Sequence, residues 1–357
     1  MPAHNEAQRV RSTILSLQQQ TTPPKTITVV LDACTDDTEA VAVAAGARTM
    51  ATINNRDKKS GALNQALDQV LPMLADNDKV LVVDADSVLA PLWIETALQV
   101  MSADSSVGAV GGIFYGEERP GMLFQLQRNE YARYARDVSR RGRGAWVLTG
   151  TSTLFRVSVL REIAASRGGL LPGDPDAYYH RQAVTEDMEI ILACLRLGYK
   201  CVSPWRCATT TELMPTWGEL WKQRLRWNHG ALENIRCYGI DRTAVPYLVQ
   251  QVWSLLCLTL AIAYPSLLLA STAEGISFHV NPFLCGVVVL SLVERLVTVR
   301  RVGAKGVLLA LALVPESCYG LFMLAVYCAG WRRFLLKRET GWHHVEHENG
   351  RSIPSVQ

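Results

Sequence analysis

The sequence lacks several features that would mark other classes of protein. Its nine cysteines form no C-x-x-C pair, and three of them, Cys257, Cys285 and Cys318, fall inside apolar runs. Neither a zinc site nor a disulfide framework is therefore indicated. A net charge of +3, without one long basic tract, argues against nucleic acid as a partner. Residues 1–6 (MPAHNE) lack the basic and apolar regions of a secretory signal, so we expect the first domain to stay in the cytoplasm.

Hydrophobic residues are distributed unevenly along the 357-residue chain. The hydrophobic fraction is 49% overall, but the long charge-free runs lie after residue 245. The length allows one sizeable α/β domain and an additional module. Lys and Arg residues cluster beside the apolar runs, which favours contact with anionic lipid headgroups. Membrane lipids are therefore an expected partner.

Residues 1–215 alternate short apolar runs typical of strands with stretches at helical spacing. This pattern predicts an α/β domain with a mainly parallel sheet and helices on both faces. The expected elements are strands at residues 26–31 and 79–83 and helices at residues 61–74, 121–141 and 185–197. Residues 167–182 are rich in Gly and Pro and predict a loop, either a mobile lid or an inert connector.

Carboxylates follow both predicted strands. Asp32 follows the first run, and Asp84 and Asp86 follow the second. Ligands of open parallel sheets collect beyond the carboxyl ends of the strands, so these side chains are expected to face a site. The i, i+2 spacing of Asp84 and Asp86 suits Mg²⁺ or Mn²⁺ held together with phosphate oxygens. A solvated turn at the end of the strand is the alternative interpretation.

Two further segments carry candidate catalytic or ligand-binding side chains. Thr185-Glu186-Asp187 opens a predicted helix, where a carboxylate is favoured electrostatically whatever its role. Asp187 is also a candidate general base, which must reach a substrate proton by a hydrogen bond. Residues 223–227 (QRLRW) precede the first long apolar run. Their arginines and tryptophan are either interfacial anchors or functional groups.

Three apolar runs follow, at residues 245–270, 282–299 and 306–331. A helix needs roughly 20 residues to cross a bilayer, and basic loops favour the cytoplasmic side. The basic residues after the second and third runs fit two crossings but not three. We therefore predict a hairpin of the first two runs, with the third run either interfacial or bent at Pro315.

Charged residues interrupt the later two apolar runs. Glu294 and Arg295 lie in the second run and Glu316 lies in the third. Charges within a membrane are often functional and would suit a transport role. Pairing between them, or burial against the protein, is the alternative interpretation.

Six motifs occur in an order that is more specific than any one of them. They are Pro2-Ala3-His4-Asn5-Glu6, Asp32 in LDACTDDT, Lys59 in KSGALNQAL, Asp84-Ala85-Asp86, Thr185-Glu186-Asp187 and Gln223-Arg224-Leu225-Arg226-Trp227. This series resembles family 2 glycosyltransferases, in particular the branch containing hyaluronan, chitin, cellulose and poly-N-acetylglucosamine synthases. The resemblance spans residues 2 to about 230. It implies a GT-A, Rossmann-like catalytic domain followed by an α-helical membrane region.

The resemblance also implies a role for each motif. The residues expected to bind the nucleotide-sugar donor are Pro2, His4, Glu6, Asp32, Lys59, Asp84, Asp86, Gln223, Arg226 and Trp227. Asp84 and Asp86 would hold Mg²⁺ or Mn²⁺ as well. Asp187 would be the catalytic base, with Glu186 beside it. Gly150 and Thr151 are similar to the family's acceptor-side segment, and Trp227 would contact the acceptor too.

The chain departs from the family pattern in two places. The family normally has an apolar strand directly before the P-x-x-N-E segment, whereas this sequence begins at Met1. A missing central strand would leave many backbone groups unpaired, so we expect either an upstream extension of the reading frame or another segment in its place. The short membrane region weakens the case for a complete secretion channel in one subunit, and a homo-oligomer stays open.

The residues and the resemblance together predict an inverting, metal-dependent transfer of sugar from a nucleotide-sugar to a polysaccharide at the plasma membrane. A polyprenyl-phosphate acceptor is the alternative, and a non-catalytic scaffold or transport component is a more distant one. The expected domains are a catalytic domain at 1–215, interfacial helices at 216–244, transmembrane or interfacial helices at 245–331 and a basic cytoplasmic tail at 332–357.

Overall fold

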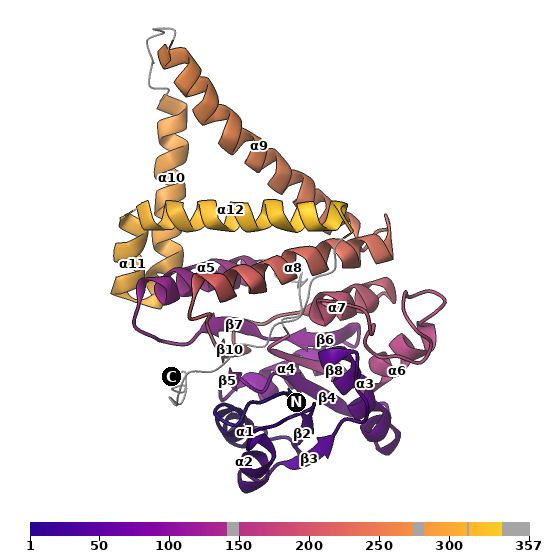
Figure 1. Ribbon diagram of the computed structural model, residues 1–357. Helices are drawn as coiled ribbons and strands as arrows, with labels where there is room; N and C mark the ends of the chain where they lie inside the picture. Colours follow the sequence, from indigo (N-terminus) through magenta and orange to yellow (C-terminus); the bar gives the residue numbers. More distant parts are fainter. Residues whose placement is uncertain (141–149, 274–281, 313, 338–357) are drawn as a thin grey trace.

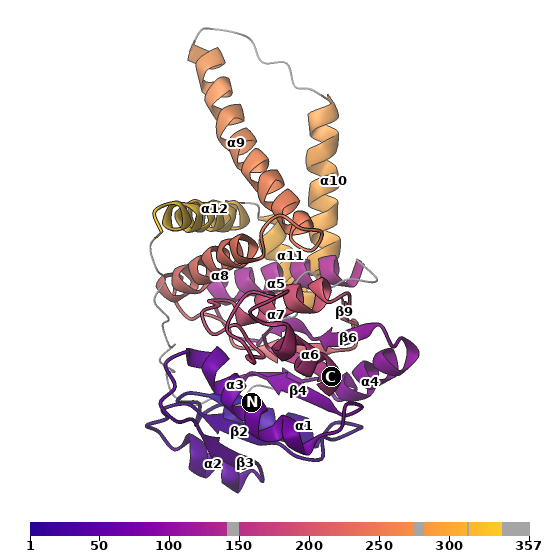
Figure 2. The same cartoon turned by 90° about the vertical axis from the view of Figure 1, so that its right-hand side faces the viewer.

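A computed structural model describes residues 1–140, 150–273, 282–312 and 314–337. The α/β part of the chain forms one end of the molecule in Figure 1, and the C-terminal helices form the other. Helices α5 (Met122–Arg140) and α8 (Trp217–Tyr238) lie between the two parts. Helix α12 (Val314–Leu335) lies alongside α8, and α9 (Val245–Ala273) and α10 (Pro282–Val299) point away from the α/β part (Figures 1 and 2).

The first sheet is parallel and carries the N-terminal motif. Its strands, in spatial order, are β1 (Pro2–Ala3), β2 (Thr28–Leu31) and β3 (Arg48–Ala51). Helices α1 (Val10–Gln18) and α2 (Thr38–Ala44) pack on it through a small apolar core that includes Val10, Ile14, Val29 and Ala42. The first strand has only two residues here, and its Pro2 pairs with Val30.

The other two sheets are mixed, so the prediction of a mainly parallel sheet is confirmed only in part. The second sheet has the order β4 (Lys79–Val83), β8 (Ser152–Arg156), β6 (Val107–Gly111) and β9 (Lys200–Val202). Strand β8 runs antiparallel to both β4 and β6. The third has the order β5 (Val88–Leu89), β10 (Ala208–Thr211) and β7 (Ile113–Gly116). Apolar runs reveal strands but carry no information on strand direction, so the antiparallel pairs could not be predicted.

The predicted strand and helices of the α/β part are otherwise confirmed. The strand predicted at 79–83 agrees with β4 in both bounds. The helices are α3 (Lys58–Val70) with a 3₁₀ turn η1 (Leu71–Met73), α4 (Trp93–Ala103), α5 (Met122–Arg140), α6 (Val157–Ser166) and α7 (Glu186–Arg196). The strand predicted at 26–31 begins two residues later, at Thr28. Residue 141 of the predicted 121–141 helix lies outside the described residues.

The C-terminal helices begin with α8 (Trp217–Tyr238). The Thr216 hydroxyl caps this helix by accepting a hydrogen bond from the Glu219 backbone N–H at 3.2 Å. The elements that follow are α9 (Val245–Ala273), α10 (Pro282–Val299), the 3₁₀ turn η2 (Arg300–Val302), α11 (Ala304–Leu311) and α12 (Val314–Leu335). The predicted tail beyond residue 337 lies outside the described residues.

Within the described ranges, no helix taken singly is both long and apolar enough to cross a membrane. Helices α11 and α12 meet the length and composition criteria only as a pair, and they meet at an angle of 81°. The bend lies beside Pro315, the second residue of α12, as predicted. The predicted hairpin of 245–270 and 282–299 corresponds to α9 and α10, and its crossing of a membrane stays a prediction.

Two acidic residues of the apolar runs contact α5 rather than each other. Glu316 is buried and pairs with Arg133 at 3.1 Å, and it also accepts a hydrogen bond from Asn129 at 2.8 Å. Glu294 pairs with Arg136 at 3.3 Å. A buried carboxylate needs such partners to offset its lost hydration. These pairs fasten α10 and α12 to the α/β part of the molecule.

The loop at 167–182 is anchored by one buried arginine. The side chain of Arg167 has no exposed surface and pairs with the equally buried Glu189 of α7. Its guanidinium also donates to the carbonyl oxygens of Pro172, Ala177 and Tyr178, at 2.8, 3.3 and 3.0 Å. These contacts favour the connector interpretation of this loop over the lid.

The buried Arg167–Glu189 pair generates a stability prediction. Removing one partner leaves an uncompensated buried charge, which costs about 3–5 kcal/mol. Glu189→Gln is therefore expected to lower the free energy of unfolding by that amount, measured by denaturant unfolding of the purified chain. The control is Glu118→Gln, because the side chain of Glu118 is 72% exposed. Equal stability of the two variants would contradict the anchoring role.

Candidate active site

The centre of the candidate site is the ammonium group of Lys59. Its Nζ lies 2.6 Å from Asp84 Oδ1 and 2.7 Å from Glu186 Oε1. Lys59 lies in the first turn of α3, Asp84 directly follows β4, and Glu186 begins α7. Although burial opposes the charge, the two carboxylates raise the pKa of Lys59 well above its usual value. One cation thus joins three segments that are distant in the sequence.

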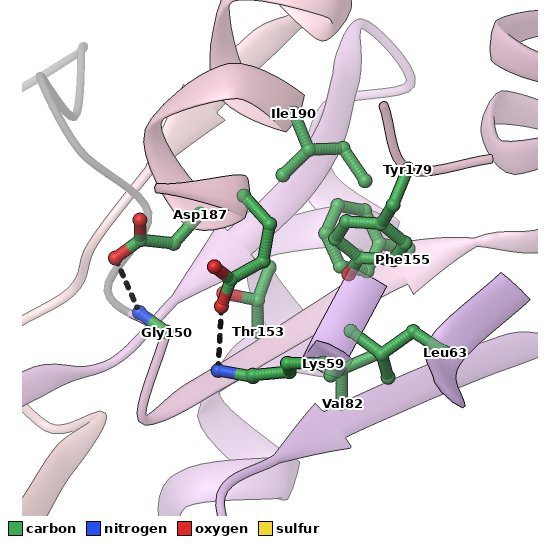
Figure 3. Close-up of a pocket in the computed structure, with 10 residues that line it drawn as sticks. Lys59, Leu63, Val82, Gly150, Thr153, Phe155, Tyr179, Asp187 and Ile190 are labelled. Carbon is green, nitrogen blue, oxygen red and sulfur yellow. Dashed lines mark hydrogen bonds and ion pairs between the residues drawn. The ribbon is translucent and has the colours of Figure 1, made fainter. Parts of the chain in front are cut away.

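Asp187 lies next to this centre and faces Gly150 (Figure 3). Asp187 Oδ2 accepts a hydrogen bond from the Gly150 backbone N–H at 3.2 Å, and Oδ1 accepts one from Met188 N–H at 2.8 Å. Burial raises the pKa of Asp187 to about 6 and Glu186 adds to the shift, whereas Lys59 and Arg226 oppose it. Asp187 is therefore a carboxylate at neutral pH but protonates in mild acid.

Glycine at position 150 allows the backbone to approach these charged groups. A Cβ there would lie 3.2 Å from Lys59 Nζ and 3.3 Å from Asp187 Oδ2, closer than side chains usually pack. Behind Lys59, the pocket has apolar walls from Leu63, Val82, Phe155, Tyr179 and Ile190. Its volume is only about 10 Å³, about one water. This space is too small for a nucleotide-sugar.

Asp84 and Asp86 carry more negative charge than their surroundings neutralise. Burial raises the pKa of Asp86 to about 6, and Glu6 and Glu212 add to this shift. Burial also raises the pKa of Asp84 to about 6, where Lys59 opposes the shift and Asp86 adds to it. Each carboxylate would return toward its ordinary pKa beside a cation.

The same two carboxylates fit a divalent metal ion. Hard cations such as Mg²⁺ prefer carboxylate oxygens and usually keep ligands from water or substrate phosphates. No group of three or more His, Cys, Asp or Glu side chains suited to a metal ion occurs among the residues that the structure describes. Asp84 and Asp86 can therefore supply two ligand groups, and the remaining ligands must come from water or from a bound diphosphate.

The predicted nucleoside-side residues gather at the ends of β1 and β2. Asp32 Oδ1 accepts hydrogen bonds from Thr52 and Asn55, each at 2.8 Å, and the Asp32 carbonyl lies 2.6 Å from His4 Nδ1. The backbone N–H of Glu6 donates to the Thr38 hydroxyl at 2.8 Å. Thr52 and Asn55 are missing from the sequence prediction. Their position directly after a strand, among polar residues, is the signal that could have identified them.

Helix α8 brings the QRLRW segment to the same site. Asn234 donates to both the carbonyl and hydroxyl oxygens of Thr185, at 2.9 and 3.0 Å. Gly230 also abuts Thr185, since a Cβ there would lie 2.7 Å from that side chain. This packing sets α8 against the start of α7, and Arg226 acts on the charges of both Glu186 and Asp187.

Trp227 is held by an arginine that the sequence prediction did not single out. The guanidinium of Arg224 lies 4.2 Å from the centre of the Trp227 ring and pairs with Glu130 of α5 at 3.0 Å. Arg224 also donates a hydrogen bond to the Gln223 side chain, and the Tyr319 hydroxyl of α12 donates to Glu130. One face of Trp227 is therefore occupied by a cation rather than open to a ligand.

Apart from Asp86, the predicted residues divide into three neighbouring groups. Lys59, Asp84, Glu186, Asp187 and Gly150 form the centre, and the Thr151 carbonyl joins it by accepting a hydrogen bond from the Asp84 N–H at 3.2 Å. The second group surrounds Asp32. It is linked to the start of α3 through Asn55, which donates to the Lys58 carbonyl at 2.7 Å. The third group is on α8. The binding and catalytic roles of all of these residues stay predictions.

Comparisons with known proteins identify the family of the chain. Residues 1–230 match the family model described as glycosyltransferase like family 2. The chain is 24% identical over 242 residues to the poly-beta-1,6-N-acetyl-D-glucosamine synthase of Staphylococcus epidermidis, covering 65% of this chain and 54% of the relative. It is also 24% identical over 243 residues to the synthase of the same name from Staphylococcus aureus strain COL. The chain spans about half the length of these curated relatives.

A solved structure supports the fold over nearly the whole chain. It is the mannosyltransferase PcManGT from Pyrobaculum calidifontis in complex with GDP-Man and Mn²⁺. Its TM-score is 0.60 at 18% identity, and the match covers 95% of this chain and 86% of that one. The family match covers more than half of the sequence, and the GT-A fold that the sequence predicted is confirmed. The chain belongs to glycosyltransferase family 2.

Proposed function

We propose that this enzyme transfers a sugar from a nucleotide-sugar, a UDP-sugar by the family resemblance, to a polysaccharide acceptor with inversion at the anomeric carbon. The observation that carries the proposal is the convergence of Asp84, Glu186 and Asp187 around Lys59 at the end of β4. Such transfer needs a group that takes a proton from the acceptor and groups that stabilise the departing diphosphate. The site contains candidates for both.

Asp187 is the proposed general base. The acceptor hydroxyl oxygen forms the new bond to the anomeric carbon, its proton passes to the Asp187 carboxylate, and the bond from that carbon to the diphosphate breaks. Glu186 is engaged by Lys59, so it is better placed to position the lysine than to act as a nucleophile. Lys59 pairs with Asp84 and Glu186 but, among the described contacts, not with Asp187. This arrangement supports direct displacement by one base, which inverts the sugar, over a double displacement through a covalent intermediate.

Asp84 and Asp86 are the proposed ligands for Mg²⁺ or Mn²⁺. Such an ion, when bound, neutralises charge on the diphosphate leaving group. The solved mannosyltransferase contains both a nucleotide-sugar and Mn²⁺, which supports a divalent ion for this chain. Arg226 is the proposed second cation at the diphosphate, since a guanidinium can pair with two phosphate oxygens.

The polysaccharide acceptor is proposed from the two curated relatives, whose names describe polymer synthesis. Gly150, Thr151 and Trp227 would lie on the acceptor side. A polyprenyl-phosphate acceptor is the second candidate, because α9 and α10 extend from the catalytic part as apolar helices. Sizing the product made from a labelled donor separates the two. A polymer supports the first candidate, and a single organic-soluble product supports the second.

We also propose that the enzyme works at the cytoplasmic face of the plasma membrane. The proposed division is a catalytic domain at 1–215, interfacial helices at 216–244, membrane helices at 245–331 and a tail at 332–357. The start of α8 at Trp217 and of α9 at Val245 supports the first two boundaries. Pairing of Glu294 and Glu316 with α5 engages two of the three charges that a transport role would use.

The Asp187→Asn variant tests the base. We expect transfer to fall by about 10²–10⁴-fold, the usual contribution of a general base. The affinity for the nucleotide-sugar should stay within about twofold, because an amide oxygen can still accept the hydrogen bond from Gly150. Turnover and donor binding are measured separately. The control is Asp68→Asn, which changes an exposed carboxylate of α3. Near-normal turnover by Asp187→Asn would rule out Asp187 as the general base.

The pH dependence tests the same assignment independently. The pKa values of Asp84, Asp86 and Asp187 are all raised to about 6, and each group is active as the carboxylate. The rate is therefore expected to be complete above this pH and to fall as the pH drops through 6. A bound cation lowers the pKa of its ligands, so at saturating Mn²⁺ only Asp187 should titrate near pH 6. The rate should then fall about tenfold for each pH unit below that pKa. A flat kcat/KM down to pH 5 would contradict the assignment.

A further inference from the structure

A cavity separate from the carboxylate site lies where α8, α9 and α12 meet. Its volume is about 310 Å³, within the range of about 300–1,000 Å³ for small-molecule sites. The apolar walls come from Leu232 and Ile235 of α8, Leu248 of α9, and Trp331 and Phe334 of α12. Figure 1 shows the three helices converging at the foot of α9. An apolar chain of matching width would fill this space.

Two polar side chains line the cavity, and they differ in how fully their hydrogen-bonding groups are used. Gln251 of α9 is engaged within the helices, because the Tyr327 hydroxyl donates to its side-chain oxygen at 3.0 Å. Arg236 lines the cavity with a side chain that is 57% exposed. It pairs with Glu233 one turn earlier and lies 5.9 Å from the centre of the Phe334 ring. Its guanidinium has five donors, more than one carboxylate uses, so it can also bind an anion.

Additional positive charge lies at this end of α12. Arg332 and Arg333 directly follow the cavity residue Trp331. Burial lowers the pKa of His229, and both Arg333 and Arg236 act in the same direction, which places the two arginines in one neighbourhood. An apolar cavity with cations near its wall is complementary to a hydrocarbon chain that carries an anionic head.

The surface beside the cavity is apolar as well. Val249, Val252 and Trp253 of α9 have 61%, 66% and 65% of their surface exposed. Exposed apolar surface that continues into a cavity is typical of a site for a membrane or a protein partner. The basic groups at the cavity favour an anionic membrane surface.

We propose that this cavity holds one acyl chain of an anionic membrane phospholipid, whose phosphate pairs with Arg236. The proposal rests on the membrane location proposed above but not on the sugar-transfer reaction. Arg236 lies ten residues beyond Arg226 on α8, or about 15 Å at 1.5 Å per residue. A phosphate at Arg236 is therefore a different site from the diphosphate proposed at Arg226, and a lipid-linked acceptor is one of the outcomes tested below. The lipid would instead stabilise the packing of α8 against α9 and α12.

The position of the cavity gives the lipid a structural consequence. Ile235 and Arg236 line the cavity, whereas the neighbouring Asn234 holds Thr185 at the start of α7. One turn of α8 therefore contacts both the proposed lipid and the segment that carries Asp187. An occupied cavity would fix the position of α8 and, through it, the QRLRW segment.

The test is lipid binding by the full chain in detergent, measured by native mass spectrometry with dioleoyl-phosphatidylglycerol as the probe. We expect the unmodified chain to hold one molecule. Leu248→Trp fills the cavity and should abolish this binding, whereas Val249→Trp, an exposed neighbour on α9, should retain it. Unchanged melting of Leu248→Trp shows that the variant is folded. Equal binding by the two variants would overturn the site.

The anionic head is tested separately. Arg236→Gln should weaken phosphatidylglycerol binding about tenfold, equivalent to about 1.4 kcal/mol, and Arg242→Gln, an exposed arginine just after α8, should leave it unchanged. Equal affinity for dioleoyl-phosphatidylcholine would overturn the role of the arginine. Tighter binding of a polyprenyl phosphate would overturn the choice of a phospholipid. A dimer that Leu248→Trp dissociates would show that a second copy fills the cavity instead.

Discussion

The ion pairs of Lys59 with Asp84 and Glu186 are the interaction on which the rest of the site depends. Without the ammonium, buried carboxylates from the end of β4 and the start of α7 would face each other with no counter-charge, and like charges at that range repel strongly. With it, the two segments are joined and Gly150 can approach Asp187. The same lysine leaves Asp84 shared between a fixed cation and the proposed metal ion, so donor binding is expected to redistribute these contacts.

A second set of charged contacts joins the C-terminal helices to the catalytic part. Glu130 of α5 binds Arg224 of α8 and accepts a hydrogen bond from Tyr319 of α12. Glu316 of α12 is buried against Arg133, also on α5. Buried pairs of this kind specify one arrangement of helices more than they add stability. Helix α5 thereby sets the position of Trp227 and of the helices proposed to meet the membrane.

Much of the catalytic half could be predicted from the sequence, because each signal is local. The apolar run of β4 and the two aspartates after it mark a strand end, and the acidic start of α7 marks a helix N-terminus. The antiparallel direction of β8 could not be predicted, since hydrophobic pattern carries no direction. Arg224 and Glu130 were missed for a related reason. A contact between two helices cannot be inferred from the spacing of residues within either helix.

The most direct test of the account is diffraction from crystals of the chain with a nucleoside diphosphate and Mn²⁺. Anomalous scattering locates the metal independently of any assumption about its ligands. We expect the Mn²⁺ at carboxylate oxygens of Asp84 or Asp86 and at the diphosphate, with Arg226 beside the phosphates and Asp187 facing the space that the sugar would occupy. A diphosphate bound on another face, or a metal held away from both aspartates, would contradict it.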